Sequence, residues 1–333
     1  MRKAIVTGIG GQDGAFLANL LLSKGYQVYG ADRRRVNVEY SHLVSLGIKE
    51  KVKFVYFDLS EEHQISRLIR DLQPDEFYNL AAMSFVKASF DLPMLTADVD
   101  AIGPLRIMEA IRSYSPHTRF YQASTSEMFG LVQAVPQTEM TPFYPRSPYG
   151  VAKLYAHWMV VNYRESYGLH FSSGILFNHE SEFRGEEFVT QKIVKAACNI
   201  KAGNQQELVL GNIDAKRDWG HAEDYVYGMY LMLQKETAGD YILATGSTVS
   251  VREFVEKVFQ KLDIHIEWKG KGLSEKGYDL NSGELIVRIS EDFYRPAEVD
   301  LLIGDASKAR LELGWEPKMT LDNIIDRMIS FQS

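Results

Sequence analysis

The chain has 333 residues, of which 45% are hydrophobic and 24% are charged, so it is long enough for two domains with separate cores. Its formal net charge of −7 argues against a general affinity for nucleic acid or for an anionic membrane. Anionic ligands must therefore be bound by local groups of cations, such as residues 33–35 and the pair Lys216-Arg217.

Compartment and redox chemistry follow from two further observations. The single cysteine, Cys198, lies in an apolar helical run and cannot form an internal disulfide, so we expect a buried, inert thiol. No signal peptide precedes the first predicted strand, and no apolar run approaches the roughly 20 residues that a membrane helix needs. We expect a cytoplasmic protein.

Short apolar strands alternate with amphipathic helices through the first half of the chain. Strands are predicted at residues 3–8, 26–31, 52–58, 76–82, 119–124 and 171–176. Helices are predicted at 13–24, 61–72 and 96–114, and from Ser147 as N-cap with Pro148 in the first turn. This alternation predicts an α/β fold with a Rossmann-type, doubly wound parallel sheet.

The regular alternation of strands and helices ends after residue 178. We expect residues 1–178 to form a nucleotide-binding Rossmann domain and residues 179–333 to form mainly a smaller, mixed α/β substrate-binding domain. Segments near 212–247, including 222–233 and 240–245, are expected to return to the first domain.

A glycine-rich turn, Thr7-Gly8-Ile9-Gly10-Gly11-Gln12-Asp13-Gly14, joins the first strand to the first helix. Glycines at 8, 11 and 14 permit a tight turn and a close approach of the backbone to a pyrophosphate at the helix N-terminus. Alone, the motif is also compatible with a plain strand-to-helix turn.

The end of the second strand carries two conflicting signals about the cofactor. Asp32 favours a free ribose 2′-hydroxyl, as in NAD, whereas Arg33 and Arg34 favour a 2′-phosphate. We favour NADP over NAD because the guanidinium groups can screen one carboxylate and still bind a phosphate; a solvated basic loop is the alternative. Asp58-Leu59 and Asn79-Leu80-Ala81-Ala82 end two further strands, where nucleotides lie in such sheets.

Two motifs indicate proton and hydride chemistry. In Ser147-Pro148-Tyr149-Gly150-Val151-Ala152-Lys153 the phenol and the ammonium lie one helical turn apart on one face. In Ala123-Ser124-Thr125-Ser126-Glu127 a carboxylate stands beside a hydroxyl, which supplies an acid/base pair for the same pocket. The alternatives are an ordinary amphipathic helix and a surface carboxylate.

These motifs resemble the nucleotide-sugar branch of the extended short-chain dehydrogenase/reductases, and within it the GDP-mannose 4,6-dehydratase family. The resemblance rests also on long segments at residues 120–127, 141–150, 174–181, 214–222 and 294–300, and it spans nearly the whole chain. It implies a lyase that converts GDP-mannose to a GDP-4-keto-6-deoxy sugar, with Thr125, Glu127, Tyr149 and Lys153 as catalytic residues.

The implied reaction has three steps. Tyr149, its pKa lowered by Lys153 and by the nicotinamide, takes the proton of the 4-hydroxyl as hydride leaves carbon 4 for NADP. Glu127 then removes the proton on carbon 5, while Glu127 or Thr125 assists the departure of water from carbon 6. Hydride returns to carbon 6, so there is no net redox change.

The resemblance also implies the binding residues. Expected cofactor contacts are Gly8, Gly11, Gln12, Asp13, Gly14, Arg33, Arg34, Asp58, Leu59, Leu80, Ala81, Ala82, Ser84, Tyr149, Lys153, His179 and Arg184. Expected substrate contacts are Ser84, Ser126, Asn178, Lys192, Arg217, Arg295 and Glu298. No metal is expected, because His179 has no second histidine or cysteine at a ligand spacing.

The chain departs from the family pattern at two places. Glu182-Phe183-Arg184-Gly185 replaces Pro-Arg-Arg-Gly, and we expect the new carboxylate and aromatic near the sugar, where an altered pocket would suit GDP-D-glycero-D-manno-heptose. Residues 35–40 replace a serine-rich stretch that reaches a neighbouring subunit, which weakens the inference of a homotetramer. A homodimer formed through helices 96–114 and 147–167, with Tyr155, Trp158 and Met159, is the alternative.

Three functions therefore remain open: a 4,6-dehydratase acting on GDP-mannose or on the manno-heptose, a GDP-sugar 4-reductase or 4-epimerase, and a non-catalytic nucleotide-binding module. Glu127 is the discriminating residue, because only the dehydratase must eliminate water.

Overall fold

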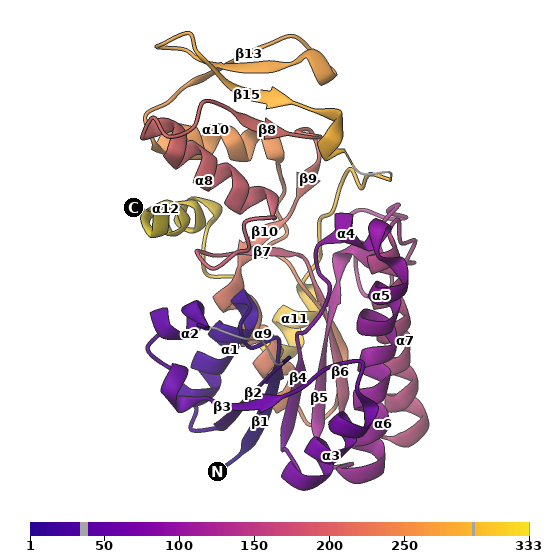
Figure 1. The fold of residues 1–333 in the computed structure, drawn as a ribbon. Helices are drawn as coiled ribbons and strands as arrows, with labels where there is room; N and C mark the ends of the chain where they lie inside the picture. The colour runs from indigo at the N-terminus through magenta and orange to yellow at the C-terminus, as the bar shows by residue number, and fades with distance from the viewer. Residues whose placement is uncertain (34–38, 295–296, 333) are drawn as a thin grey trace.

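A seven-stranded, fully parallel sheet forms the centre of the computed structural model, which describes residues 1–33, 39–294 and 297–332 (Figure 1). Its strand order is β3-β2-β1-β4-β5-β6-β11. The strands are β1 (Lys3–Thr7), β2 (Gln27–Asp32), β3 (Lys53–Tyr56), β4 (Glu76–Asn79), β5 (Arg119–Thr125), β6 (Phe171–Leu176) and β11 (Asp240–Leu243). The order reverses direction between β1 and β4, which creates a crevice at the carboxyl ends of those strands.

Helices cover both faces of this sheet (Figure 1). On one face lie α1 (Gln12–Ser23), α9 (Ala222–Gln234) and, at the periphery, α2 (Ser41–Ser45) and α11 (Ser307–Leu313). On the other lie α3 (Glu62–Leu72), α4 (Val86–Asp91), α5 (Pro93–Ala97), α6 (Gly103–Tyr114) and α7 (Pro148–Tyr167). This is the predicted Rossmann-type, doubly wound arrangement.

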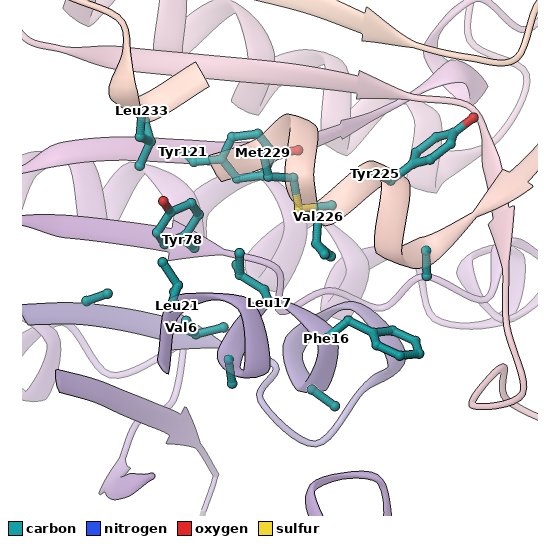
Figure 2. Close-up of a cluster of buried hydrophobic side chains, with 14 of the residues drawn as sticks. Val6, Phe16, Leu17, Leu21, Tyr78, Tyr121, Tyr225, Val226, Met229 and Leu233 are labelled. Atoms are coloured by element: carbon teal, nitrogen blue, oxygen red, sulfur yellow. The ribbon is translucent and has the colours of Figure 1, made fainter. Parts of the chain in front are cut away.

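Alternating side chains of each strand feed two separate cores. Val6, Tyr78 and Tyr121 point to the face of α1 and α9, where they pack in the cluster drawn in Figure 2. Their chain neighbours Ile5 and Phe77 point to the opposite face, against α3 and α6. Buried apolar residues in these strands made them visible in the sequence, although β4, β5 and β6 also bury polar side chains such as Glu76, Gln122 and Ser173.

The predicted helix over residues 96–114 is wrong as one regular helix. The structure has α5, a π-helical turn at Asp98–Ile102 and then α6. Pro104 in the first turn of α6 has no N–H to continue regular bonding, and the π turn carries Asp100 inward, where its Oδ1 accepts a bond of 2.9 Å from the Met83 N–H. The interruption thus brings a buried carboxylate close to the end of β4.

A second, smaller α/β region lies above the carboxyl ends of the sheet in Figure 1. It contains the four-stranded sheet β13-β14-β15-β8 and three helices. The elements are β8 (Leu208–Leu210), β13 (Ile266–Lys269), β14 (Lys276–Asp279), β15 (Leu285–Ile289), α8 (Val189–Lys201), α10 (Val251–Lys261) and α12 (Leu321–Gln332). Their apolar faces form one core, to which Phe254, Val255 and Ile325 contribute.

Short strand pairs connect the two regions. Strand β7 (Asn178–Glu180) pairs in parallel with β10 (Trp219–His221), and β9 (Lys216–Arg217) pairs antiparallel with β12 (Val249–Ser250). No helix in the part of the chain that the structure describes is long and apolar enough to cross a membrane. The remaining short elements are 3-10 turns at Lys49–Lys51, Ser126–Met128, Gly272–Ser274 and Glu291–Phe293.

Candidate active site

A cleft of about 900 Å³ lies at the carboxyl ends of β1, β4, β5 and β6, beneath the second region. It brings together most of the residues that the sequence predicts for a site. Those lining it are Gly8, Gly11, Gln12, Asp13, Gly14, Leu80, Ala82, Ser84, Thr125, Ser126, Glu127, Tyr149, Lys153, Asn178, His179, Arg184, Lys192, Arg217 and Glu298.

The glycine turn forms one end of the cleft. Gly8 adopts a φ of +66°, and a Cβ on Gly14 would lie 2.3 Å from the Gly8 carbonyl oxygen, so neither position tolerates a side chain without movement. The bare backbone therefore faces the cleft at the start of α1. This geometry fits the diphosphate of a dinucleotide, whose charge is favourable at a helix N-terminus.

Thr7 fixes the loop that follows β4 against this turn. Its Oγ1 accepts bonds of 3.0 Å from the backbone N–H groups of both Leu80 and Ala81, and donates 2.8 Å to Asn79 Oδ1. The Thr7 hydroxyl thus joins the end of β1 to the end of β4.

The four predicted catalytic residues are gathered in a buried cluster at the middle of the cleft. Thr125, Glu127, Tyr149 and Lys153 are each at most 9% exposed. Thr125 Oγ1 accepts a bond of 3.2 Å from the Glu127 N–H and also hydrogen-bonds with the Tyr149 phenol. Ser147 caps α7 by accepting 3.0 Å from the Gly150 N–H, which fixes the helix that carries Tyr149 and Lys153.

The Lys153 ammonium lies close to the tyrosine without bonding to it. Its Nζ donates 3.0 Å to the Ala123 carbonyl oxygen and lies 5.8 Å from the centre of the Tyr149 ring. Burial lowers the pKa of Lys153, and the buried Asp100 carboxylate opposes this. The site therefore holds a desolvated ammonium between a backbone acceptor and a nearby anion.

The sequence led us to expect a lowered pKa for Tyr149, and here the structure differs. Burial raises the pKa of the phenol first, the charge of Asp100 raises it further, and the hydrogen bond with Thr125 only partly opposes both. Lys153 faces the Tyr149 ring across 5.8 Å, so its charge does not offset the desolvation. The protein alone thus keeps this phenol protonated.

Cations line the opposite end of the cleft, beneath the second region. Lys192 Nζ lies 3.5 Å from the centre of the Phe293 ring, and Lys87 Nζ lies 5.6 Å from the same ring. The pKa of Lys192 is lowered by burial and then by the charge of Lys87. Arg217, on β9, is 7% exposed and donates 2.9 Å to the Lys216 carbonyl oxygen. This concentration of positive charge suits a diphosphate.

Several predicted binding residues lie elsewhere. Asp58 Oδ1 accepts bonds from the Ser60 N–H and hydroxyl, and Leu59 is buried in the core with α3 and α6. Neither they, nor Arg33, nor Ala81 line the cleft, so their contacts with a cofactor stay predictions. Arg34 and Arg295 lie outside the described residues.

The departure at Glu182-Phe183 is only partly where the sequence predicts it. Glu182 is absent from the cleft lining, and its Oε1 accepts 2.6 Å from Arg327 Nη2 of α12. Phe183 does line the cleft, and it stacks on Phe16 of α1 and on His42, at centroid distances of 5.0 and 4.6 Å. The new carboxylate is therefore used in an ion pair with the C-terminal helix, whereas the new aromatic lies at the cleft, and the heptose stays a prediction.

Some lining residues were not predicted from the sequence. They include Lys87, Phe188, Asn212 and Phe293. Lys87 could have been found, because it follows Ser84 by less than one helical turn; Phe188 and Phe293 carry no local signal of a site. Among the described residues, no three His, Cys, Asp or Glu side chains gather in a way that could hold a metal ion.

Comparisons with known proteins agree with this architecture. A sequence profile of the family "GDP-mannose 4,6 dehydratase" matches residues 5–328. A GDP-mannose 4,6-dehydratase of Sinorhizobium fredii is 51% identical over 98% of this chain and 95% of its own length. A GDP-mannose 4,6 dehydratase of Drosophila melanogaster is 50% identical over 98% of this chain and 85% of its own.

Solved structures at lower identity share the fold. A dTDP-glucose 4,6-dehydratase from Streptomyces venezuelae with NAD and TYD bound superposes with a TM-score of 0.83 at 21% identity, covering 99% of this chain and 96% of that one. The RMD protein of Pseudomonas aeruginosa, complexed with NADPH, gives 0.78 at 21% identity, covering 100% and 99%. Because the profile match covers nearly all of the chain and relatives are about half identical to it, this protein is a member of the GDP-mannose 4,6-dehydratase family.

Proposed function

We propose that this protein is a GDP-sugar 4,6-dehydratase that converts GDP-mannose to GDP-4-keto-6-deoxymannose. The observation that carries the proposal is the burial of Glu127 with Thr125, in one cluster with Tyr149 and Lys153. Oxidation or epimerisation at carbon 4 needs the phenol and the ammonium, but only elimination of water needs the additional carboxylate. The family relatives named above carry the same activity in their names.

A nicotinamide cofactor would be held by the glycine turn at the start of α1 and would act as a reversible hydride acceptor for the sugar. The proton transfers fall to side chains of this chain. The protein alone keeps Tyr149 protonated, so the charges of the Lys153 ammonium and of a bound oxidised nicotinamide would be needed to stabilise its phenolate. That phenolate would take the proton of the 4-hydroxyl and become the neutral phenol. The resulting 4-ketone acidifies the proton on carbon 5, which Glu127 removes and then delivers to the leaving 6-hydroxyl with Thr125.

The cofactor is proposed to be NADP, with Arg33 and Arg34 as ligands of a 2′-phosphate. Asp32 stands at the end of β2 and accepts 2.8 Å from the Arg33 N–H with its Oδ1, so backbone bonding occupies part of the carboxylate that would read a free ribose. Comparing the dissociation constants of NADPH and NADH tests this choice directly.

The GDP moiety is proposed to lie toward the second region, where Lys192, Arg217 and Lys87 would bind its diphosphate. In this division, residues 1–178 with the returning segments bind the cofactor, and residues 179–333 bind most of the substrate. Arg295 and Glu298 belong to the same proposed site, with Ser84, Ser126 and Asn178 nearer the sugar.

A homodimer is proposed to form through α5 and α7. These neighbouring helices expose large apolar side chains, including Leu95, Val151, Tyr155 and Trp158, with exposed fractions between 41% and 56%. Patches of this kind mark interaction surfaces. Light scattering on the wild-type protein and on Trp158→Lys tests this, and an unchanged particle mass in the variant would contradict it.

The deciding experiment incubates purified protein with GDP-mannose and, separately, with GDP-D-glycero-D-manno-heptose, and follows loss of one water by mass spectrometry. We expect dehydration of GDP-mannose, abolished in Glu127→Gln and retained in the surface control Glu61→Gln. Dehydration of the heptose alone would move the proposal to that substrate. Oxidation or epimerisation at carbon 4 without water loss would replace it by a reductase or epimerase.

A further inference from the structure

His179 lies between two oxygen acceptors at the start of α1. Its Nε2 is 2.8 Å from Asp13 Oδ2, and its Nδ1 is 2.8 Å from the Phe177 carbonyl oxygen. A carboxylate and a carbonyl can only accept hydrogen bonds, so each ring nitrogen must carry a hydrogen to satisfy its partner. With Asp13 ionised, the geometry therefore requires a doubly protonated ring, an imidazolium, in a side chain that is only 10% exposed.

The surroundings are consistent with this charge. Burial alone would lower the pKa of His179, but the Asp13 carboxylate outweighs burial, and the pKa is raised above its ordinary value. Burial would likewise raise the pKa of Asp13, but the nearby His179 holds it below its ordinary value. The ring stacks on Tyr225, with centroids 4.6 Å apart.

The other ionisable groups near His179 do not neutralise Asp13 or His179 in place of this pair. Arg184 lowers the pKa of His179 and is itself paired with Glu180, whose Oε2 lies 3.1 Å from Arg184 Nε and accepts 2.5 Å from Thr190. Burial keeps the Tyr225 phenol neutral by raising its pKa. Asp13 and His179 thus form the pair that balances charge at this point.

The position of the pair gives it a consequence for binding. Asp13 stands in the first turn of α1 and lines the cleft beside the glycine turn, where the helix N-terminus would otherwise attract a diphosphate. An uncompensated carboxylate there would repel that anion. Gln12 adds two bonds that join the turn to the segment after β7: it donates 3.1 Å to the His179 carbonyl oxygen and accepts 2.7 Å from Ser181.

We propose that His179 is a positioning residue whose imidazolium cancels the charge of Asp13, and so allows the start of α1 to bind the diphosphate of the dinucleotide cofactor. The inference rests on the proposed function, since it concerns the cofactor site of the same reaction. In this proposal His179 acts on the cofactor site only through Asp13. The histidine lies on β7, and Asp13 lies in the first turn of α1.

A double-mutant cycle of Asp13 and His179 tests the proposal. His179→Gln leaves Asp13 without a counter-charge, and we expect NADPH to bind about 10- to 100-fold more weakly. Asp13→Asn removes the need for the second proton, because the new amide can donate to a neutral ring. Since Asp13 is itself an expected cofactor contact, the affinity of Asp13→Asn is the reference for the double variant Asp13→Asn/His179→Gln, which should bind within about threefold of it. His63→Gln, an exposed histidine on α3, is the control.

Nitrogen NMR provides a readout that needs no cofactor. We expect one histidine with protons on both ring nitrogens at pH 7.5, absent in His179→Gln and converted to a neutral ring in Asp13→Asn. A neutral His179 in wild type, or additive losses of affinity in the double variant, would overturn the proposal. If wild type binds neither NADPH nor NADH, the proposed cofactor fails, and the NMR result still decides the charge of His179.

Discussion

The two sides of the cleft obtain their functional groups in different ways. On the side of the seven-stranded sheet, Thr125 and Glu127 follow one strand and Tyr149 and Lys153 share one helix, so short stretches of chain deliver the whole acid/base set. On the other side, Lys192, Arg217 and Phe293 come from α8, β9 and a 3-10 turn that are far apart in sequence. The proposed chemistry thus depends on groups supplied by short segments, and the proposed substrate binding depends on tertiary assembly.

This difference predicts that variants on the two sides change different kinetic constants. The largest effect is expected for Tyr149→Phe, which removes the oxygen that, as phenolate, would accept the first proton, and should lower kcat by about 10²- to 10⁴-fold. KM should change little, because the ring and its packing remain. Steady-state kinetics with GDP-mannose measures both constants, and a loss of less than tenfold in kcat would contradict the assignment.

Arg217→Gln is expected to give the opposite pattern. Loss of a charge-assisted bond to the diphosphate should raise KM by about 10- to 100-fold and leave kcat near the wild-type value. Lys216→Gln, its exposed chain neighbour, is the matched control. A fall in kcat with unchanged KM would show that the cation acts on the reacting sugar, and would erase the contrast between the two sides.

The amino ends of the sheet should affect stability without affecting activity. Glu76 is 1% exposed and accepts 2.8 Å bonds from both Tyr26 and Tyr78, and 3.1 Å from Gln234. Glu76→Ala leaves these donors unsatisfied and should lower the free energy of unfolding by about 3 kcal/mol. Urea denaturation measures this, with Glu76→Gln as the milder control. An effect below about 1 kcal/mol would contradict the prediction.

The smallest expected effect concerns the ion pair between Glu182, which follows β7, and Arg327 of the C-terminal helix α12. Burial would raise the pKa of Glu182, but His221 at 3.7 Å, its own backbone N–H and the ion pair with Arg327 lower it to about 2. A depressed carboxyl pKa stabilises the fold above the ordinary value of 4.5, and this stabilisation is lost as pH falls toward 2.

When the pH falls from about 5 to about 3, the free energy of unfolding of Glu182→Gln should therefore fall by about 1 kcal/mol less than that of wild type. The difference is small because solvent screens the partly exposed Arg327. Denaturation midpoints at several pH values measure the difference. Parallel curves for the two proteins would show that the pair contributes nothing to folding.

The sequence alone determined the Rossmann-type sheet and the acid/base cluster, because both rest on local rules. The central strands are rich in buried apolar residues, a serine and a proline mark the start of α7, and the spacing from Tyr149 to Lys153 fixes one helical face. The regular helical period failed only at residues 98–102, where a π turn before Pro104 buries Asp100 against the Met83 N–H.

Only the tertiary structure decided the environment of these groups. The four-stranded sheet was not predicted from the sequence: β13, β14 and β15 follow one another along the chain, and β8 joins them from a distant segment. The raised pKa of Tyr149, the burial of Asp100 beside Lys153 and the diversion of Glu182 to Arg327 all depend on which elements pack together. Residue type specifies which chemistry is possible, whereas burial and neighbouring charges, which only folding brings together, decide the protonation state in which each group acts.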